Sequence, residues 1–148
     1  MPQDISGYDV GALLYCPANA HHTVAQAVAA ERLPRPFSLA LCLEDTVRAD
    51  ALAAAEQAVE QTLHDLTDAA RQETFYRPLA FVRVRSPEQL ARLGRAYGKY
   101  RPLLTGFILP KFFIETCGAY CAVIRDLQAD GLDYFYMPVF EAPSMLPL

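Results

Sequence analysis

Short apolar runs alternate along the chain with longer segments in which apolar residues recur at helical spacing. The short runs are predicted to be β-strands at residues 12–16, 37–43, 79–82, 106–109 and 134–140. The run at 37–43 is almost wholly apolar and ends abruptly at Glu44-Asp45. A continuous apolar run of this length is typical of a strand buried on both faces, as in a parallel sheet.

The segments between these runs are predicted to form about four helices. The clearest covers residues 49–70, where one apolar stripe contains Leu52, Ala55, Val59, Leu63 and Leu66. A helix is also predicted to begin at Asn19, a second at Ser86-Pro87, and a third to cover 115–129 with Ala119, Ala122, Val123 and Leu127 as its apolar positions.

This alternation indicates an α/β fold whose parallel strands are joined by right-handed helical crossovers. Two architectures fit it: an open doubly wound sheet, or part of a (β/α)8 barrel. The first strand-to-helix turn, residues 16–20, contains no glycine. Phosphate-binding loops need glycines there so that the backbone can approach the phosphate, which weighs against the nucleotide-binding forms of an open sheet.

Composition narrows the functional class further. A chain of 148 residues is sized for one domain. Its net charge of -4 argues against nucleic-acid binding, and no apolar run approaches the roughly 20 residues of a membrane helix. Residues 1–4 lack the features of a signal peptide, so a cytoplasmic protein is expected. The four cysteines are expected to be reduced structural thiols, because no second Cys or His pair lies at zinc-site spacing.

Charged residues follow the second to fifth predicted strands. In chain order they are Glu44-Asp45, Arg83 with Arg85, Lys111, and Glu141. The carboxyl ends of parallel strands lie on one rim, where α/β folds place their chemistry. Each of these residues alone is also compatible with an ordinary solvated strand end. Arg85 shares the strand face of Arg83 only while the strand continues; if the strand ends at residue 84, a solvated loop residue is expected.

Such a rim suits metal-assisted chemistry on an oxygen-rich anion. A carboxylate such as Glu141 can ligate Mg²⁺, which prefers oxygen ligands and keeps several waters. Glu44 and Asp45 can orient those waters, and an arginine can pair bidentately with a substrate carboxylate. His21-His22 are expected to be ordinary helix-start residues, because adjacent helical residues point in different directions.

Five motifs resemble the successive strand motifs of the HpcH/HpaI aldolase and citrate lyase β-subunit family. They are Leu14-Tyr15-Cys16-Pro17-Ala18, Cys42-Leu43-Glu44-Asp45-Thr46-Val47, Phe81-Val82-Arg83-Val84-Arg85, Gly106-Phe107-Ile108-Leu109-Pro110-Lys111 and Met137-Pro138-Val139-Phe140-Glu141. The resemblance implies a TIM-barrel fold, Mg²⁺ dependence, and cleavage of a C–C bond by a retro-aldol or retro-Claisen reaction. The implied substrate is a small hydroxy or oxo acid, free or as a coenzyme A thioester.

The resemblance also implies a role for each residue of the rim. Arg83 would bind the substrate carboxylate or oxyanion, and Glu141 would be one of two acidic metal ligands. Glu44 and Asp45 would support the metal waters and the acid/base network, which Lys111 would brace.

The matched motifs cover only about five of the family's eight βα units. Residues 1–148 are therefore expected to form a single domain, the N-terminal part of a partial TIM (β/α)8 barrel, either as a fragment or as a shortened relative. The family's second metal-ligating aspartate has no counterpart in the sequence. Two open strand edges would favour a homo-oligomer. The alternative function is a catalytically incomplete barrel fragment that binds a ligand or serves in assembly.

Overall fold

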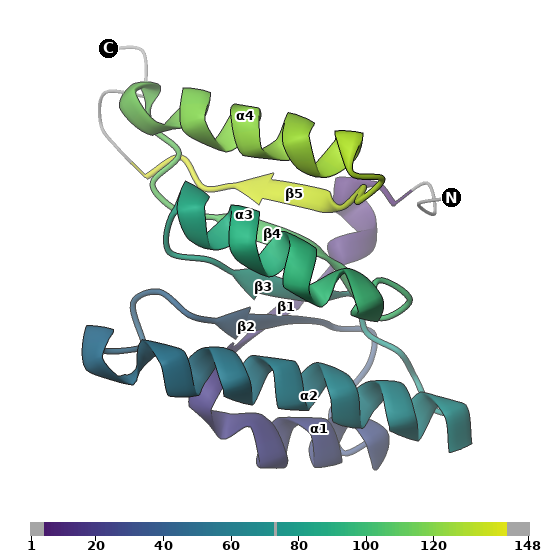
Figure 1. Ribbon diagram of the computed structural model, residues 1–148. Helices are drawn as coiled ribbons and strands as arrows, with labels where there is room; N and C mark the ends of the chain where they lie inside the picture. The colour runs from purple at the N-terminus through teal and green to yellow at the C-terminus, as the bar shows by residue number, and fades with distance from the viewer. Residues whose placement is uncertain (1–4, 73, 142–148) are drawn as a thin grey trace.

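The computed structural model describes residues 5–72 and 74–141, and its centre is one parallel sheet (Figure 1). The strands lie side by side in chain order, β1-β2-β3-β4-β5. Their bounds are β1 (Leu13–Pro17), β2 (Ser38–Cys42), β3 (Ala80–Arg83), β4 (Leu104–Leu109) and β5 (Phe135–Pro138). Each neighbouring pair is parallel, as the alternating sequence predicts.

A helix follows each of the first four strands. The α-helices are α1 (His21–Ala29), α2 (Leu52–Gln72), α3 (Pro87–Ala96) and α4 (Ile114–Ala129), and short 3-10 turns are η1 (Gly7–Val10), η2 (Ala18–Ala20), η3 (Ala49–Ala51) and η4 (Tyr97–Tyr100). Ser86 caps α3 as predicted, since its hydroxyl accepts a hydrogen bond from Gln89 N. The predicted order of strands and helices is confirmed.

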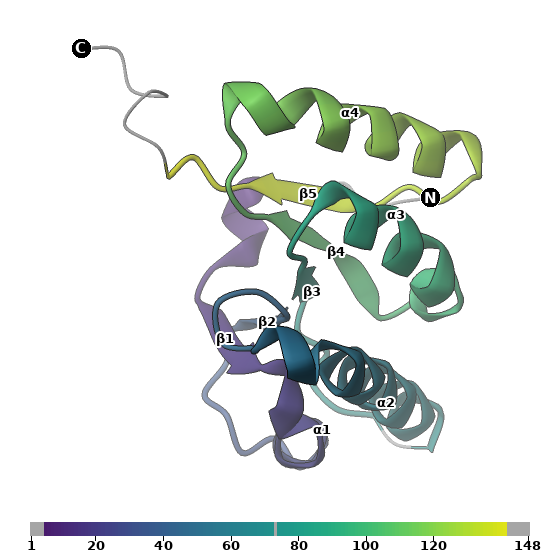
Figure 2. The same ribbon diagram turned by 60° about the vertical axis from the view of Figure 1, so that its left-hand side comes forward.

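All four helices pack on one face of the sheet, and this decides between the two architectures. Strand residues such as Leu41, Val82 and Phe107 belong to the large core that they share with the helices. The residues that alternate with them, such as Phe81 and Ile108, form a separate cluster without any α-helical residue. Figure 2 shows the helices following one side of the curved sheet. A doubly wound sheet has helices on both faces and a switch in strand order, so this fold is a partial α/β barrel.

The face without helices is also apolar. Ala40, Phe81 and Ile108 are buried there beside Val10 of η1. The rings of Phe81 and Phe135 meet edge to face, with their centroids 6.1 Å apart. Gly106 lies between these two residues in the register of β4, and its lack of a side chain allows the close approach of the β5 backbone, because a Cβ there would lie 1.7 Å from Phe135 O. The inner face of the strands is thus packed with side chains, as in a barrel interior.

The predicted buried face of α4 is confirmed in part: Leu127 is buried and Val123 packs against the core as expected, but the two alanines do not. Ala119 and Ala122 are exposed, whereas Tyr120 and Leu127 are buried. Tyr120 stacks on Phe112, with ring centroids 5.8 Å apart. Large side chains bury more apolar area than alanine does, so they determine which side of a largely apolar helix faces the core.

Two further predictions concern the whole described chain. Across residues 5–72 and 74–141, no helix combines the length and the apolar character needed to cross a bilayer. All four cysteines are free, as predicted. Cys42 is buried, as expected of a structural thiol, whereas Cys121 is exposed and does not fit that expectation. The side chains of His21 and His22 lie outside the described part, and their assignment stays a prediction.

Candidate active site at the strand ends

Glu44 is a buried carboxylate held between two cations at the carboxyl ends of the strands. Only 4% of its side chain is exposed. Arg83 Nη2 donates to Glu44 Oε2 at 2.6 Å, and Lys111 Nζ lies 3.0 Å from Glu44 Oε1. We call Glu44, Arg83 and Lys111 the charged triad. Arg83 is the last residue of β3, Glu44 and Lys111 follow β2 and β4, and the parallel register of the sheet brings the three together. The prediction that the strand ends converge is confirmed for this triad.

The two cations keep Glu44 ionised. Burial by itself raises the pKa of Glu44, but Lys111 and Arg83 outweigh it and hold that pKa below its ordinary value. Reciprocally, the Glu44 carboxylate beside Lys111 Nζ raises the pKa of Lys111. Burial lowers the pKa of Arg83, but the Glu44 carboxylate outweighs that effect and raises it overall. All three groups are therefore charged at neutral pH.

Two buried polar atoms of this triad lack a hydrogen-bond partner within the described residues. They are Glu44 Oε1, which the Lys111 ammonium approaches without hydrogen-bond alignment, and Arg83 Nε. Buried donors and acceptors are nearly always paired in proteins, and an orphan calls for an explanation such as a bound water, ion or ligand. Of these two atoms, Glu44 Oε1 still faces the Lys111 ammonium at 3.0 Å, so Arg83 Nε is the one that a bound polar group would satisfy.

Asp45 lies at the solvent side of the same triad. Its Oδ2 accepts a hydrogen bond from Arg83 Nη2 at 3.2 Å, and 68% of its side chain is exposed. Arg83 thus uses one terminal nitrogen for both carboxylates of the Glu44-Asp45 pair. The two neighbouring acids occupy different environments, one buried and one open to solvent.

Glu141 joins the rim through the backbone of Lys111. Its Oε1 accepts a hydrogen bond from Lys111 N at 2.8 Å. Lys111 has a φ of 50°, in the left-handed region that non-glycine residues rarely adopt, and its carbonyl accepts from Thr116 Oγ1 at 2.6 Å. Strained backbone of this kind is often found at functional sites. Hydrogen bonds to both the N–H and the carbonyl of Lys111 therefore fix the turn after β4 that carries the Lys111 ammonium.

The described residues do not contain a complete metal centre. No group of three or more His, Cys, Asp or Glu residues in residues 5–72 and 74–141 is arranged to hold a metal ion. Glu44 and Asp45 face cationic side chains. Glu141 is the one predicted site carboxylate for which the described residues show no ion pair, and it contributes oxygen, the donor that Mg²⁺ prefers.

Arg85 occupies neither of the positions considered for it. β3 ends at Arg83, so Arg85 is not part of the strand face, yet it is half-buried rather than solvated. Its Nε donates to Leu43 O at 3.3 Å, and Nη2 donates to Glu44 O at 3.1 Å and to Val47 O. The solvated-loop prediction is wrong because the guanidinium turns back onto the segment that follows β2.

Tyr15 was not predicted as part of this site. The guanidinium carbon of Arg83 lies 5.9 Å from the centroid of the Tyr15 ring, and the Tyr15 side chain is partly exposed in the middle of β1. A search for charged residues after strands passes over β1, because none follows it. The available signal was the single aromatic residue, Tyr15, within the first predicted strand.

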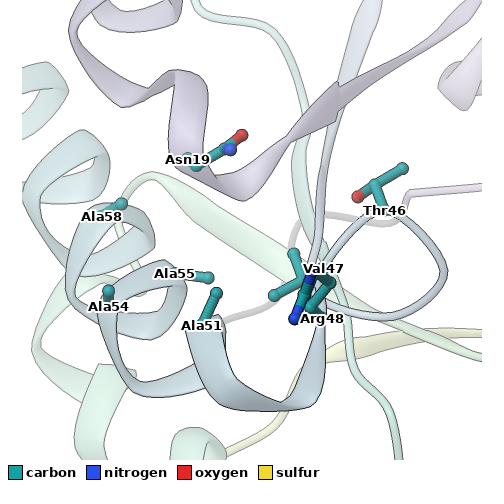
Figure 3. Close-up of a pocket in the computed structure, with 8 residues that line it drawn as sticks. All are labelled: Asn19, Thr46, Val47, Arg48, Ala51, Ala54, Ala55 and Ala58. Atoms are coloured by element: carbon teal, nitrogen blue, oxygen red, sulfur yellow. The ribbon is translucent and has the colours of Figure 1, made fainter.

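A cavity of about 360 Å³ lies beside the segment after β2, outside the charged triad (Figure 3). Ala51, Ala54, Ala55 and Ala58 line one side, and Asn19, Thr46, Val47 and Arg48 complete the lining. Its walls are mostly apolar and include none of the three charged triad residues. The charged rim, not this cavity, carries the chemically active groups.

Comparison with known proteins agrees with the fold. A search of the curated proteins found no match to the chain. A family model described as a C–C bond lyase of the TIM-barrel fold matches residues 4–147, which is nearly the whole sequence. The chain therefore belongs to the C–C bond lyase family of TIM-barrel proteins.

Proposed function

We propose that the chain carries part of the active site of an Mg²⁺-dependent lyase of the HpcH/HpaI aldolase and citrate lyase β-subunit type. Its substrate class would be a small hydroxy or oxo acid, free or as a coenzyme A thioester. The observation that carries the proposal is the buried Glu44 between Arg83 and Lys111, with Arg83 Nε left without a hydrogen-bond partner among the described residues. The buried Arg83 Nε offers one cationic donor to a polar ligand.

In this proposal Arg83 holds the negative charge that develops during C–C cleavage. When the bond breaks, its electron pair moves onto the carbonyl oxygen of the departing fragment as an enolate. A fixed cation beside that oxygen stabilises the charge without rearranging solvent. Glu44 and Asp45 hold Arg83 in place, and its side chain is only 14% exposed.

The two carboxylates suit different tasks. Glu44 has a lowered pKa and two cationic neighbours, so it is a weak base whose main effect is to keep both cations in position. Asp45 is exposed and touches Arg83 through one oxygen. We assign to Asp45 the acceptance of the substrate hydroxyl proton, which it then passes to solvent.

Mg²⁺ fits the donor chemistry of the rim through Glu141. Mg²⁺ in proteins is commonly bound by one or two carboxylates together with waters and substrate oxygens. Glu141 would contribute one carboxylate, and Glu44 and Asp45 would orient water around the ion. When bound, the metal would polarise the substrate carbonyl as a Lewis acid.

The test is Mg²⁺-dependent cleavage of citryl- and malyl-coenzyme A by the full-length protein. We expect Arg83→Lys to reduce kcat/KM by about 10²–10³, because lysine keeps the charge but loses the planar fork. Arg101→Lys is the matched control, since Arg101 donates to a backbone carbonyl, Gly131 O, at 2.8 Å and belongs to no part of the rim. Absence of turnover, or Arg83→Lys and Glu141→Gln variants that behave as wild type, would overturn the proposal.

The second candidate function is a ligand-binding or assembly subunit without turnover. The lack of a three-ligand acidic cluster within the described residues favours it. This candidate predicts that oxaloacetate binds, measured by calorimetry, while no thioester is cleaved at saturating Mg²⁺. Cleavage that responds to Mg²⁺ would decide against it.

A further inference from the structure

The segment after β2 is held by one guanidinium. Three of its carbonyls, those of Leu43, Glu44 and Val47, accept hydrogen bonds from Arg85. Arginine has five N–H donors in a planar fork, and here two of its nitrogens serve three acceptors at once. A lysine ammonium is a single donor centre and cannot reproduce this arrangement.

The backbone amide of Arg85 is itself anchored to two helices through Gln89. Gln89 Oε1 on α3 accepts from Arg85 N at 2.7 Å, and Gln89 Nε2 donates to Glu56 Oε1 on α2 at 2.7 Å. Arg92 binds the same Glu56 carboxylate through both terminal nitrogens, at 2.8 and 2.6 Å. Arg85 therefore links a cross-braced pair of helices to the segment that carries the acid pair.

The clamped carbonyls lie next to the functional carboxylate. Glu44 receives Arg85 on its backbone and Arg83 with Lys111 on its side chain. The remaining bonds of the segment are the backbone contacts Leu43 N to Arg83 O at 3.0 Å and Val47 N to Glu44 O at 3.1 Å, and a long one from Thr46 Oγ1 to Cys42 O at 3.5 Å. Arg85 is thus the one side chain outside this segment that fixes its main chain within the described residues.

We propose that Arg85 is a positioning residue, which fixes the backbone of residues 43–47 so that the Glu44 carboxylate stays between Arg83 and Lys111. This inference rests on the proposed function for its link to catalysis. Its structural content is independent of turnover, because it concerns where Glu44 is held. Groups that orient a functional side chain typically change activity 10–100-fold when they are removed.

The experiment compares Arg85→Met and Arg85→Lys with Arg101→Met and Arg101→Lys, which remove a clamp on a carbonyl far from the rim. ¹³C NMR follows the titration of the Glu44 carboxyl, with Arg83, Lys111 and Asp45 as the charged groups around it. We expect the Glu44 midpoint to move to higher pH in Arg85→Met, less in Arg85→Lys, and not in the Arg101 pair. An unchanged midpoint in a folded Arg85→Met protein, or an equal change in Arg101→Met, would overturn the inference.

Two measurements, kcat and the Glu44 titration, distinguish a failure of this inference from a failure of the proposed function. If the wild type cleaves a thioester, Arg85→Met should lower kcat at least about tenfold; a kcat equal to wild type would contradict the inference. If it cleaves none, the proposed function fails while the Glu44 titration still decides the role of Arg85. Should both Arg85 variants fail to fold, proton exchange at Arg85 Nε in ¹⁵N-labelled wild type is compared with that of the exposed Arg125. Slow exchange at Arg85 supports the clamp, and exchange as fast as at Arg125 contradicts it.

Discussion

Glu44 has the environment of an ion-pair hub rather than that of a free catalytic base. A buried carboxylate stripped of partners would be protonated near neutrality, but each oxygen of Glu44 faces a cation. Removing one member of such a cluster leaves the other charges poorly compensated. The functional consequence is that changes at Glu44 should alter the placement of Arg83 before they alter any proton transfer.

The first prediction is that Glu44→Gln destabilises the protein in a pH-dependent way. Because the folded-state pKa of Glu44 is lowered, its stabilising contribution is present above the unfolded pKa of about 4.3 and is lost as pH falls through the folded value. We expect a loss of about 2 kcal/mol at pH 7, less than for a fully buried pair because Lys111 is largely exposed. Urea unfolding at pH 7, 5, 4 and 3 measures it. The control Glu60→Gln, at the surface pair with Lys99, should cost less than about 1 kcal/mol.

The second residue-scale prediction concerns the left-handed backbone of Lys111. At a φ of 50°, glycine avoids the steric cost that a Cβ imposes. Lys111→Gly should therefore be about 1 kcal/mol more stable than Lys111→Ala, although both lose the ammonium. At Ala119, an exposed position in α4, the order should be reversed: the wild-type alanine should be more stable than Ala119→Gly. Equal stability of the two Lys111 variants in urea unfolding would show that this backbone is not strained.

At the scale of elements, periodicity predicted the order of strands and helices but only part of the buried face of α4. The sequence of α2 selects one buried face, because its apolar residues recur at helical spacing between polar ones. Val59 and Leu63 on that face are fully buried as predicted. Around Ala119-Tyr120 the sequence is apolar on several sides, so spacing alone does not select a face. The neighbouring helix selects it, since Leu127 fits directly over Gly94 of α3.

The packing of α4 on α3 leads to a prediction about two helical glycines. A Cβ at Gly94 would lie 2.7 Å from Leu127 Cδ1, whereas a Cβ at Gly118 would meet nothing within 4 Å. Gly118→Ala should stabilise the protein by about 0.5–1 kcal/mol through helix propensity. Gly94→Ala gains the same propensity but forces Leu127 aside, an overpacking cost of about 1–3 kcal/mol that makes the net effect destabilising. Thermal unfolding of both variants checks the order; a more stable Gly94→Ala would contradict the close approach of the two helices.

At the scale of the molecule, topology brought the predicted rim residues together because carboxyl ends of parallel strands share one edge. Arg85 escaped prediction because it is neither a strand residue nor a solvated loop residue: β3 ends at Arg83, and the Arg85 side chain is half-buried. Its three carbonyl partners come from a loop on another strand, and loop carbonyls leave no signature in side-chain chemistry. The roles of Mg²⁺, Glu141 and the substrate remain predictions, as does the single-domain extent of residues 1–148.

The last prediction concerns association through the edges of the sheet. β1 and β5 each have one neighbour in the described sheet, and Leu14 and Tyr15 on β1 are 39% and 45% exposed. An open edge with apolar side chains favours pairing with another copy, so we expect sedimentation at tens of micromolar to give a species larger than a monomer. Leu14→Lys should shift this species toward monomer, because charge on an edge strand opposes pairing. Ile114→Lys is the matched control, since Ile114 is 68% exposed and belongs to α4 rather than to an edge strand. A wild-type monomer, or dissociation by Ile114→Lys alone, would assign the edge strands no role in self-association.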